Sequence, residues 1–191
     1  MIVDMLNTDH VESWQQTTAA RIGLAVLQAR KAAGISAFEL SAKCKALGVT
    51  VHRSTISKLE SGERTRFDVG ELLILAAALN VSPSQLLFPA LPDGPVEAIP
   101  GTIVSSWTAY RWVTGEAPLT PDAAAAGMQS RQLLTAVRKR AAVQLQLGQI
   151  LIETGLEPSR EAAMAPLRQQ LETRLYELTA TIAALGGVIT S

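Results

Sequence analysis

The strongest constraint on the fold is a helix-start pattern that occurs three times between residues 36 and 85. Each copy places Ser or Asp three residues before Glu or Gln, with apolar residues flanking the pair. The pairs are Ser36 with Glu39, Asp68 with Glu71, and Ser82 with Gln85. In such a capping box the first side chain accepts a hydrogen bond from a backbone amide of the new helix, and the second side chain reaches back. Three helices are therefore expected to start here.

Glycines placed after apolar, helix-forming runs supply the matching stop signals. Gly34 and Gly62 lie where a helix should end, because glycine takes the left-handed conformation of a C-terminal cap without steric cost. Between them, Ile56 and Leu59 mark the inward face of a further short helix. Together these signals predict five helices, over residues 19–33, 37–47, 53–61, 69–79 and 83–88.

Residues 91–120 are rich in Pro and Gly and predict a connector in which no long helix fits. The connector nevertheless holds Trp107, Tyr110 and Trp112, an aromatic cluster that a disordered linker would not carry. Residues 105–114 are long enough for two or three helical turns. We therefore expect this stretch to pack against another part of the protein.

The C-terminal part predicts two long amphipathic helices. Residues 121–154 contain no proline after Pro121, and leucine and valine recur there near the helical period. A second helix follows Pro158, and Pro166 should kink that helix or mark its start. Its apolar residues are spaced by seven, with two more interleaved, as in a short coiled-coil seam. They are Met164, Leu171, Leu178 and Leu185, with Leu175 and Ile182 between them.

The expected fold class is all-α. It consists of an N-terminal extension (1–18), a five-helix domain (19–90), the connector with its aromatic cluster (91–120) and a long helical hairpin (121–191). Such a hairpin leaves an apolar stripe exposed unless it packs on the five-helix domain or on a second copy of the chain.

Charge and cysteine content narrow the classes of function. The chain has 17 Lys and Arg and 17 Asp and Glu, yet residues 19–90 carry nine bases against five acids. A basic block of this kind is compatible with a polyanion partner such as nucleic acid. Cys44 is the only cysteine, which excludes an internal disulfide and suits a reducing compartment. With no signal-peptide pattern and no run long enough to cross a bilayer, we expect a cytoplasmic, nucleoid-associated protein without a membrane partner.

No set of residues converges on catalysis. The sequence has two isolated histidines, no paired-carboxylate motif and no Gly-rich phosphate loop. We therefore expect no enzymatic activity, no cofactor and no metal site.

Three stretches carry a family resemblance over about residues 18–90. They are Gly34–Ser41 (GISAFELS), Arg53–Arg64 (RSTISKLESGER) and Leu72–Ser82 (LLILAAALNVS). In residue types and spacing they closely resemble the lambda-repressor-like helix-turn-helix family (Cro/CI type, XRE). More weakly, residues 96–116 resemble a segment that follows this motif in regulators of high-GC Gram-positive bacteria and their phages. The resemblance implies a DNA-binding transcription regulator whose third helix enters the major groove.

The resemblance assigns roles to individual positions, and the side-chain chemistry agrees with them. Base contacts fall on Arg53, Ser54, Ser57 and Lys58. Phosphate contacts fall on Lys43, Lys45, Thr55, Arg64 and Arg66. Arg30 and Glu60 match a pair that in the family forms an internal salt bridge between the first and third helices. A dimer interface is expected at Trp107 and along Leu171, Leu175, Leu178, Ile182 and Leu185.

Two departures from the family pattern affect the register of the third helix. The connection before Arg53 is about five residues longer than usual, so either the second helix gains a turn or Thr50 caps an earlier start. Ala37 stands where many members have a glutamine that touches phosphate and supports the third helix. The assignment of side chains to individual bases can therefore shift by one or two positions along the third helix.

The expected function is a sequence-specific repressor that binds a double-stranded DNA operator. We expect a homodimer, because one DNA-binding domain neutralises too few phosphates for tight binding. Three alternatives remain open. The chain could be an antitoxin whose C-terminal helices bind a toxin protein. It could be a ligand-responsive regulator with a pocket between the hairpin and the aromatic connector. It could also be a protein-interaction scaffold with no DNA role.

Overall fold

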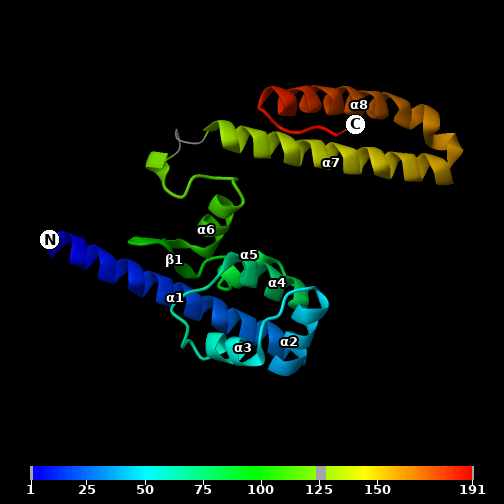
Figure 1. The fold of residues 1–191 in the computed structure, drawn as a ribbon. Helices are drawn as coiled ribbons and strands as arrows, with labels where there is room; N and C mark the ends of the chain where they lie inside the picture. The colour runs from blue at the N-terminus through cyan, green and yellow to red at the C-terminus, as the bar shows by residue number, and fades with distance from the viewer. Residues whose placement is uncertain (1, 124–127, 191) are drawn as a thin grey trace. The chain divides into compact units, whose positions relative to one another are not determined.

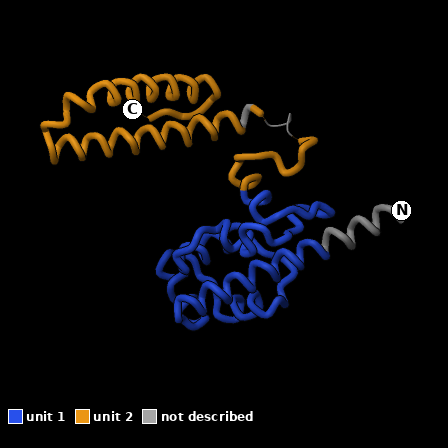
Figure 2. Tube along the Cα trace, turned by 180° about the vertical axis from the view of Figure 1, so that it is seen from behind, with its two compact units in different colours: residues 1–110 blue, residues 111–191 orange. Residues whose placement is uncertain are grey.

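The computed structural model describes residues 2–123 and 128–190, and it describes no side chains at 2–12, 129 and 130. The chain divides into two compact units, residues 1–110 and 111–191, each treated by itself (Figure 2). As expected, the fold is all-α, apart from one two-stranded sheet (Figure 1). Within the described residues, no helix has a stretch apolar and long enough to cross a bilayer.

The five helices predicted for residues 19–88 are present in unit 1. They are α1 (Ile2–Ala32), α2 (Ala37–Ala46), α3 (Arg53–Glu60), α4 (Val69–Leu79) and α5 (Pro83–Leu87). The starts of α2 to α5 are confirmed to the residue. The start predicted for the first helix, at residue 19, is wrong. Neither Pro nor Gly occurs before Gly23, so nothing stops the helix from extending through the segment expected to be an extension.

Two of the three predicted capping boxes form completely. At α2, the Ser36 amide donates to Glu39 Oε2 at 2.7 Å, and the Glu39 amide donates to Ser36 Oγ at 3.2 Å. The donation from the Ser36 amide lowers the pKa of Glu39. This carboxylate therefore stabilises the fold at neutral pH, and its contribution is lost as the pH falls through the lowered pKa. At α5, the Ser82 amide donates to Gln85 Oε1 at 2.9 Å.

The third box forms only by half. Asp68 accepts from the amides of Gly70 and Glu71 and so caps α4. The Glu71 carboxylate does not reach back, because it accepts a hydrogen bond from Arg64 at 2.6 Å. A tertiary ion pair has replaced the local contact that the sequence pattern predicted.

The core of unit 1 gathers apolar residues from all five helices. Its fully buried members include Val26 of α1, Leu40 of α2, Ile56 of α3, Leu75 of α4 and Leu86 of α5. Because every helix contributes to one cluster, the position of α3 depends on the packing of the other four.

A glycine lets α1 and α3 approach closely. A Cβ placed on Gly23 would lie 2.0 Å from the carbonyl oxygen of Leu59, a distance that no side chain tolerates. The contact is between backbones, so a movement of a flexible side chain cannot relieve it. Gly23 thus fixes how deeply α3 lies against α1.

The expected connector is partly folded onto unit 1. Strand β1 (Pro95–Ile99) pairs antiparallel with β2 (Thr102–Ser105), and α6 (Ser106–Val113) follows within the stretch where helical turns were expected. Phe88, Val96 and Ala109 form a second small cluster. The Trp14 indole nitrogen of α1 donates to the Glu97 carbonyl of β1 at 3.1 Å. The strands escaped prediction because two runs of four or five residues carry little periodic signal.

Unit 2 contains the helical hairpin. Its elements are the 3₁₀ turn η1 (Pro121–Ala123), α7 (Met128–Leu156), the 3₁₀ turn η2 (Pro158–Arg160) and α8 (Glu161–Ala184). Helices α7 and α8 run side by side along their length (Figure 1). Residues 124–127, part of the helix predicted over 121–154, lie outside the described residues. Pro166 does not mark the start of α8, which begins five residues earlier.

Helix α7 has two apolar stripes rather than one. Ala136, Val143 and Ile150 are buried. The predicted stripe, which includes Val137, Leu145 and Ile152, is instead exposed, with 67% of Leu145 accessible. At 100° per residue the two stripes lie on opposite sides of the helix. The hairpin therefore covers one apolar face of α7 and leaves the other open.

Replacing Gly23 with Ala should destabilise unit 1 by about 3 kcal/mol, because the added methyl group collides with the backbone of α3. The matched change is Gly148→Ala in α7, where nothing lies within 4 Å of the new Cβ. That variant should gain about 1 kcal/mol from higher helix propensity. Denaturant unfolding of both variants measures the difference, and equal effects would contradict the close approach.

Candidate nucleic-acid interface

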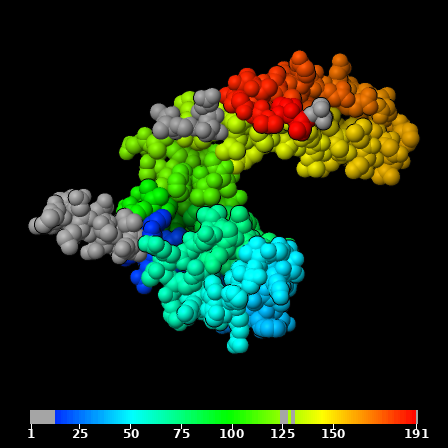
Figure 3. Space-filling model, viewed as in Figure 1, coloured from blue at the N-terminus to red at the C-terminus, as the bar shows by residue number. Residues whose placement is uncertain are grey.

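Helix α3 is amphipathic, and its polar side is open. Ile56 and Leu59 are buried in the core. The four residues expected to contact bases are all exposed: Arg53, Ser54, Ser57 and Lys58. Thr55, expected to contact phosphate, is half-buried. In Figure 3 the cyan stretch of chain, which includes α2 and the start of α3, lies at the surface of unit 1.

The long α2–α3 connection adopts neither of the two arrangements left open by the sequence. Helix α2 ends at Ala46, and Gly48 takes the left-handed conformation with φ +91°, which turns the chain away from the helix. Val51 then enters the core, and the Ser41 hydroxyl donates to its carbonyl at 2.6 Å. These anchors allow α3 to start at Arg53, although His52 makes no side-chain capping bond.

The inner end of α3 is held by a salt bridge to α1. Arg30 donates to both carboxylate oxygens of Glu60 at 2.7 Å, and the two side chains are only 14% and 9% exposed. A third hydrogen bond, at 2.8 Å, runs from Arg30 to the carbonyl of Ile35 before α2. Hydrogen bonding to Glu60 raises the pKa of Arg30. The pair implied by the resemblance is thus brought together, and it links α1, α3 and the start of α2.

The salt bridge also neutralises Glu60, the one acidic side chain of α3. A free carboxylate at Glu60 would repel a phosphate backbone, but its charge is neutralised by Arg30. The exposed ionic groups on α3 itself are then the cations Arg53 and Lys58. This side of the helix is suited to a polyanion.

The residues expected to contact phosphate fall into two groups. Lys43 and Lys45, in the last turn of α2, are exposed, and so is Arg66. Arg64 is instead paired with Glu71 at 2.6 Å, with the two side chains 26% and 23% exposed. The sequence pattern did not reveal this pairing, because it assigned Glu71 to the α4 capping box.

The residues expected at a dimer interface differ in exposure. Leu178 and Ile182 are buried within the hairpin, at 5% and 2% exposure. Leu171, Leu175 and Leu185 are partly buried. Trp107, in unit 1, is 47% exposed and stacks on Tyr110 with 5.3 Å between ring centroids. Leu178 and Ile182 would therefore meet a second copy only if the hairpin opened.

The Glu60→Gln variant should lower the free energy of unfolding of unit 1 by about 3 kcal/mol, because it leaves the Arg30 guanidinium mostly buried without a counter-charge. The matched change is Glu177→Gln in α8, whose pair with Arg174 is more than half exposed. That variant should cost less than about 0.5 kcal/mol. Denaturant melts of both variants test this, and a Glu60→Gln melt like that of the parent would contradict the role of the bridge.

Comparison with known proteins agrees with this geometry. Residues 26–86 match a family model described as "Helix-turn-helix", a span from the middle of α1 to α5. No curated protein and no solved structure shows significant similarity to the chain. The matched span includes α2, α3 and the salt bridge that joins α3 to α1. Residues 26–86 are therefore a helix-turn-helix domain of the lambda-repressor-like kind, and this match supports a DNA-binding transcription regulator.

Proposed function

We propose that unit 1 reads a specific double-stranded operator through α3 and that the chain acts as a homodimeric repressor. The observation that carries the proposal is the open, cationic side of α3, held in place by the Arg30–Glu60 bridge on its inner side. Repression is the simplest consequence of operator binding, because a protein bound at a promoter excludes other proteins from it.

The side chains on α3 match the chemistry of base edges in the major groove. Arg53 can donate two hydrogen bonds to O6 and N7 of guanine, and Lys58 can donate to the same edge. Ser54 and Ser57 can donate or accept and so suit several bases. These groups stand on consecutive turns of one exposed helix face, as a reading helix requires.

Phosphate contacts would come from cations around α3. Lys43, Lys45 and Arg66 are exposed and available for the DNA backbone. Arg64 would first have to leave Glu71, so its net contribution should be smaller than that of Arg66. Contacts of this kind fix the position of the protein on DNA and make binding sensitive to salt.

Homodimerisation is supported by the open stripe on α7. A single reading head buries a small area on DNA, and two heads on adjacent half-sites multiply specificity. Val137, Leu145 and Ile152 form an apolar line on the side of α7 opposite its contact with α8. A second hairpin packed on this line would bury it and bring two reading heads into one molecule.

The DNA test begins with selection of bound duplexes from a random pool, in which a homodimer should recover a palindromic site. Arg53→Ala and Lys58→Ala should each cost about 1–3 kcal/mol on the recovered site and relax preference at particular base pairs. Arg66→Ala should weaken all sequences alike and reduce the salt slope by about one unit. Lys31→Gln, at an exposed cation near the end of α1, is the control and should leave affinity unchanged. Unchanged affinity in the Arg53→Ala and Lys58→Ala variants for every duplex would remove the DNA reading by α3.

The dimer test uses light scattering on the full chain at micromolar concentration. The parent should have twice the mass of one chain, and Leu145→Glu should shift it toward one, because a charge would enter the apolar line. Tyr176→Glu, at a position on α8 that is 77% exposed, is the control and should remain dimeric. A parent mass equal to one chain would overturn the dimer. Purification with a second small protein on the hairpin would favour the antitoxin alternative.

A further inference from the structure

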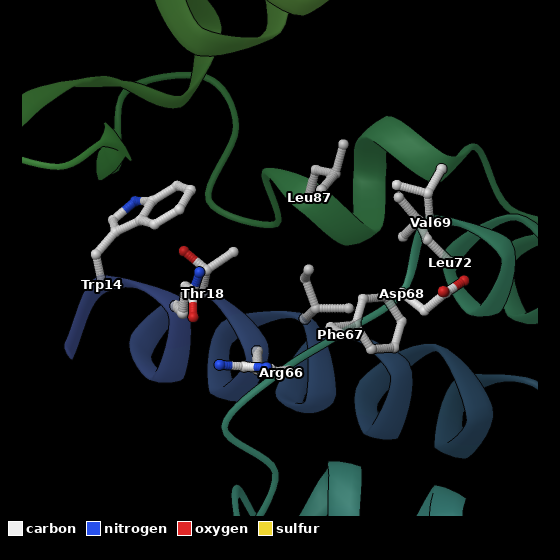
Figure 4. A pocket seen from close by; sticks show the side chains of 11 residues that line it. Trp14, Thr18, Arg66, Phe67, Asp68, Val69, Leu72 and Leu87 are labelled. Carbon is white, nitrogen blue, oxygen red and sulfur yellow. The ribbon is translucent and has the colours of Figure 1, made fainter. Parts of the chain in front are cut away.

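A cavity of about 340 Å³ opens in unit 1 on the side of α1 that faces α4 and α5. Figure 4 shows Trp14 and Thr18 on α1, Phe67 and Leu72 from the segment that leads into and forms α4, and Leu87 from α5. The walls are mainly apolar. Thr18 has a buried hydroxyl without a hydrogen-bond partner among the described residues. The volume lies at the lower end of the range for small-molecule sites.

A smaller polar hollow of about 180 Å³ adjoins this cavity. It is lined by Gln15, Gln16, Thr65 and Arg66, and it shares Gln15 and Arg66 with the apolar cavity. The two hollows together offer an apolar chamber with a cation and two amide side chains at one end. Arg66 has no hydrogen-bond or ion-pair partner among the residues that the structure describes, so its guanidinium is available to an anion.

One acidic side chain among the described residues lines the cavity, and it has partners elsewhere. Asp68 also lines the cavity, but its carboxylate accepts from the backbone amides of Gly70 and Glu71 as the cap of α4. Asp68 therefore caps α4 and forms no ion pair with Arg66. Among the described residues, Arg66 has no acidic partner.

We propose that these two neighbouring hollows, which share Gln15 and Arg66, bind a small apolar carboxylate. The apolar body would lie among Trp14, Phe67 and Leu87, where it leaves water. The carboxylate would accept hydrogen bonds from the guanidinium of Arg66, whose planar fork matches two carboxylate oxygens. The chamber admits a ligand of about one aromatic ring with a short chain.

The site has a consequence for DNA binding that rests on the proposed function. Arg66 is among the cations expected to contact the DNA backbone, and it cannot serve a phosphate and a bound carboxylate at once. The ligand and the operator therefore compete for one side chain, so ligand binding should lower DNA affinity.

The binding test uses titration calorimetry on the full chain without DNA, with 4-phenylbutyrate as the probe and 4-phenyl-1-butanol as its neutral match. The carboxylate should bind at least about tenfold more tightly than the alcohol, since a charge-assisted pair is lost with the alcohol. Arg66→Gln should abolish that preference, and Val69→Trp, at the exposed rim of the cavity, should block both compounds. Lys31→Gln should leave both affinities unchanged. Equal binding of acid and alcohol, an unaltered preference in Arg66→Gln, or no binding at millimolar probe would overturn the site.

The competition test measures affinity for the selected operator with and without 4-phenylbutyrate, at matched ionic strength with sodium acetate as the control. The probe should weaken operator binding several-fold in the parent and leave it unchanged in Val69→Trp. A probe that binds without changing operator affinity would overturn the competition. If no duplex is bound even without probe, the proposed function fails, whereas the calorimetry still decides the site.

Discussion

The close approach of α3 to α1 is the constraint on which the helix-turn-helix domain depends. It has two parts: a backbone contact made possible by Gly23, and the bidentate salt bridge between Arg30 and Glu60. The glycine sets the depth of α3, and the bridge sets its rotation, because two parallel hydrogen bonds accept one orientation of the guanidinium. Since the inner side of α3 is fixed in this way, its outer side can carry cations that contribute nothing to the core.

The parts of the fold that the sequence predicted are those governed by local chemistry. Ser36 with Glu39 and Ser82 with Gln85 marked helix starts to the residue, because a capping box satisfies backbone groups within one turn. Glu71 shows the limit of that argument. Its carboxylate accepts a hydrogen bond from Arg64 and does not complete the α4 capping box, because only the folded chain brings Arg64 near. The β1–β2 pair and the early start of α1 were missed for a related reason, since neither carries a distinctive local signal.

In the candidate site, too, local sequence signals predicted some features, and other features depend on contacts that only the folded chain makes. The exposure of Arg53, Ser54 and Lys58 was predictable, because Ile56 and Leu59 fix which side of α3 faces inward. The cavity beside Trp14 was not, since its walls come from α1, from the segment before α4 and from α5. In the hairpin, the stripe through Leu145 was recognised as apolar, but a different stripe of α7 is the one that is buried.

The two arginines before α4 show how one short segment can hold different roles. Arg64 and Arg66 are two residues apart, and a reader of the sequence would treat them alike. In the structure Arg64 is bound to Glu71, so removing it from that partner costs the energy of an ion pair. Arg66 has no such cost and lies where an apolar chamber meets a polar hollow. Of the two, Arg66, which has no partner among the described residues, is therefore the one whose charge an incoming anion, whether phosphate or carboxylate, can engage first.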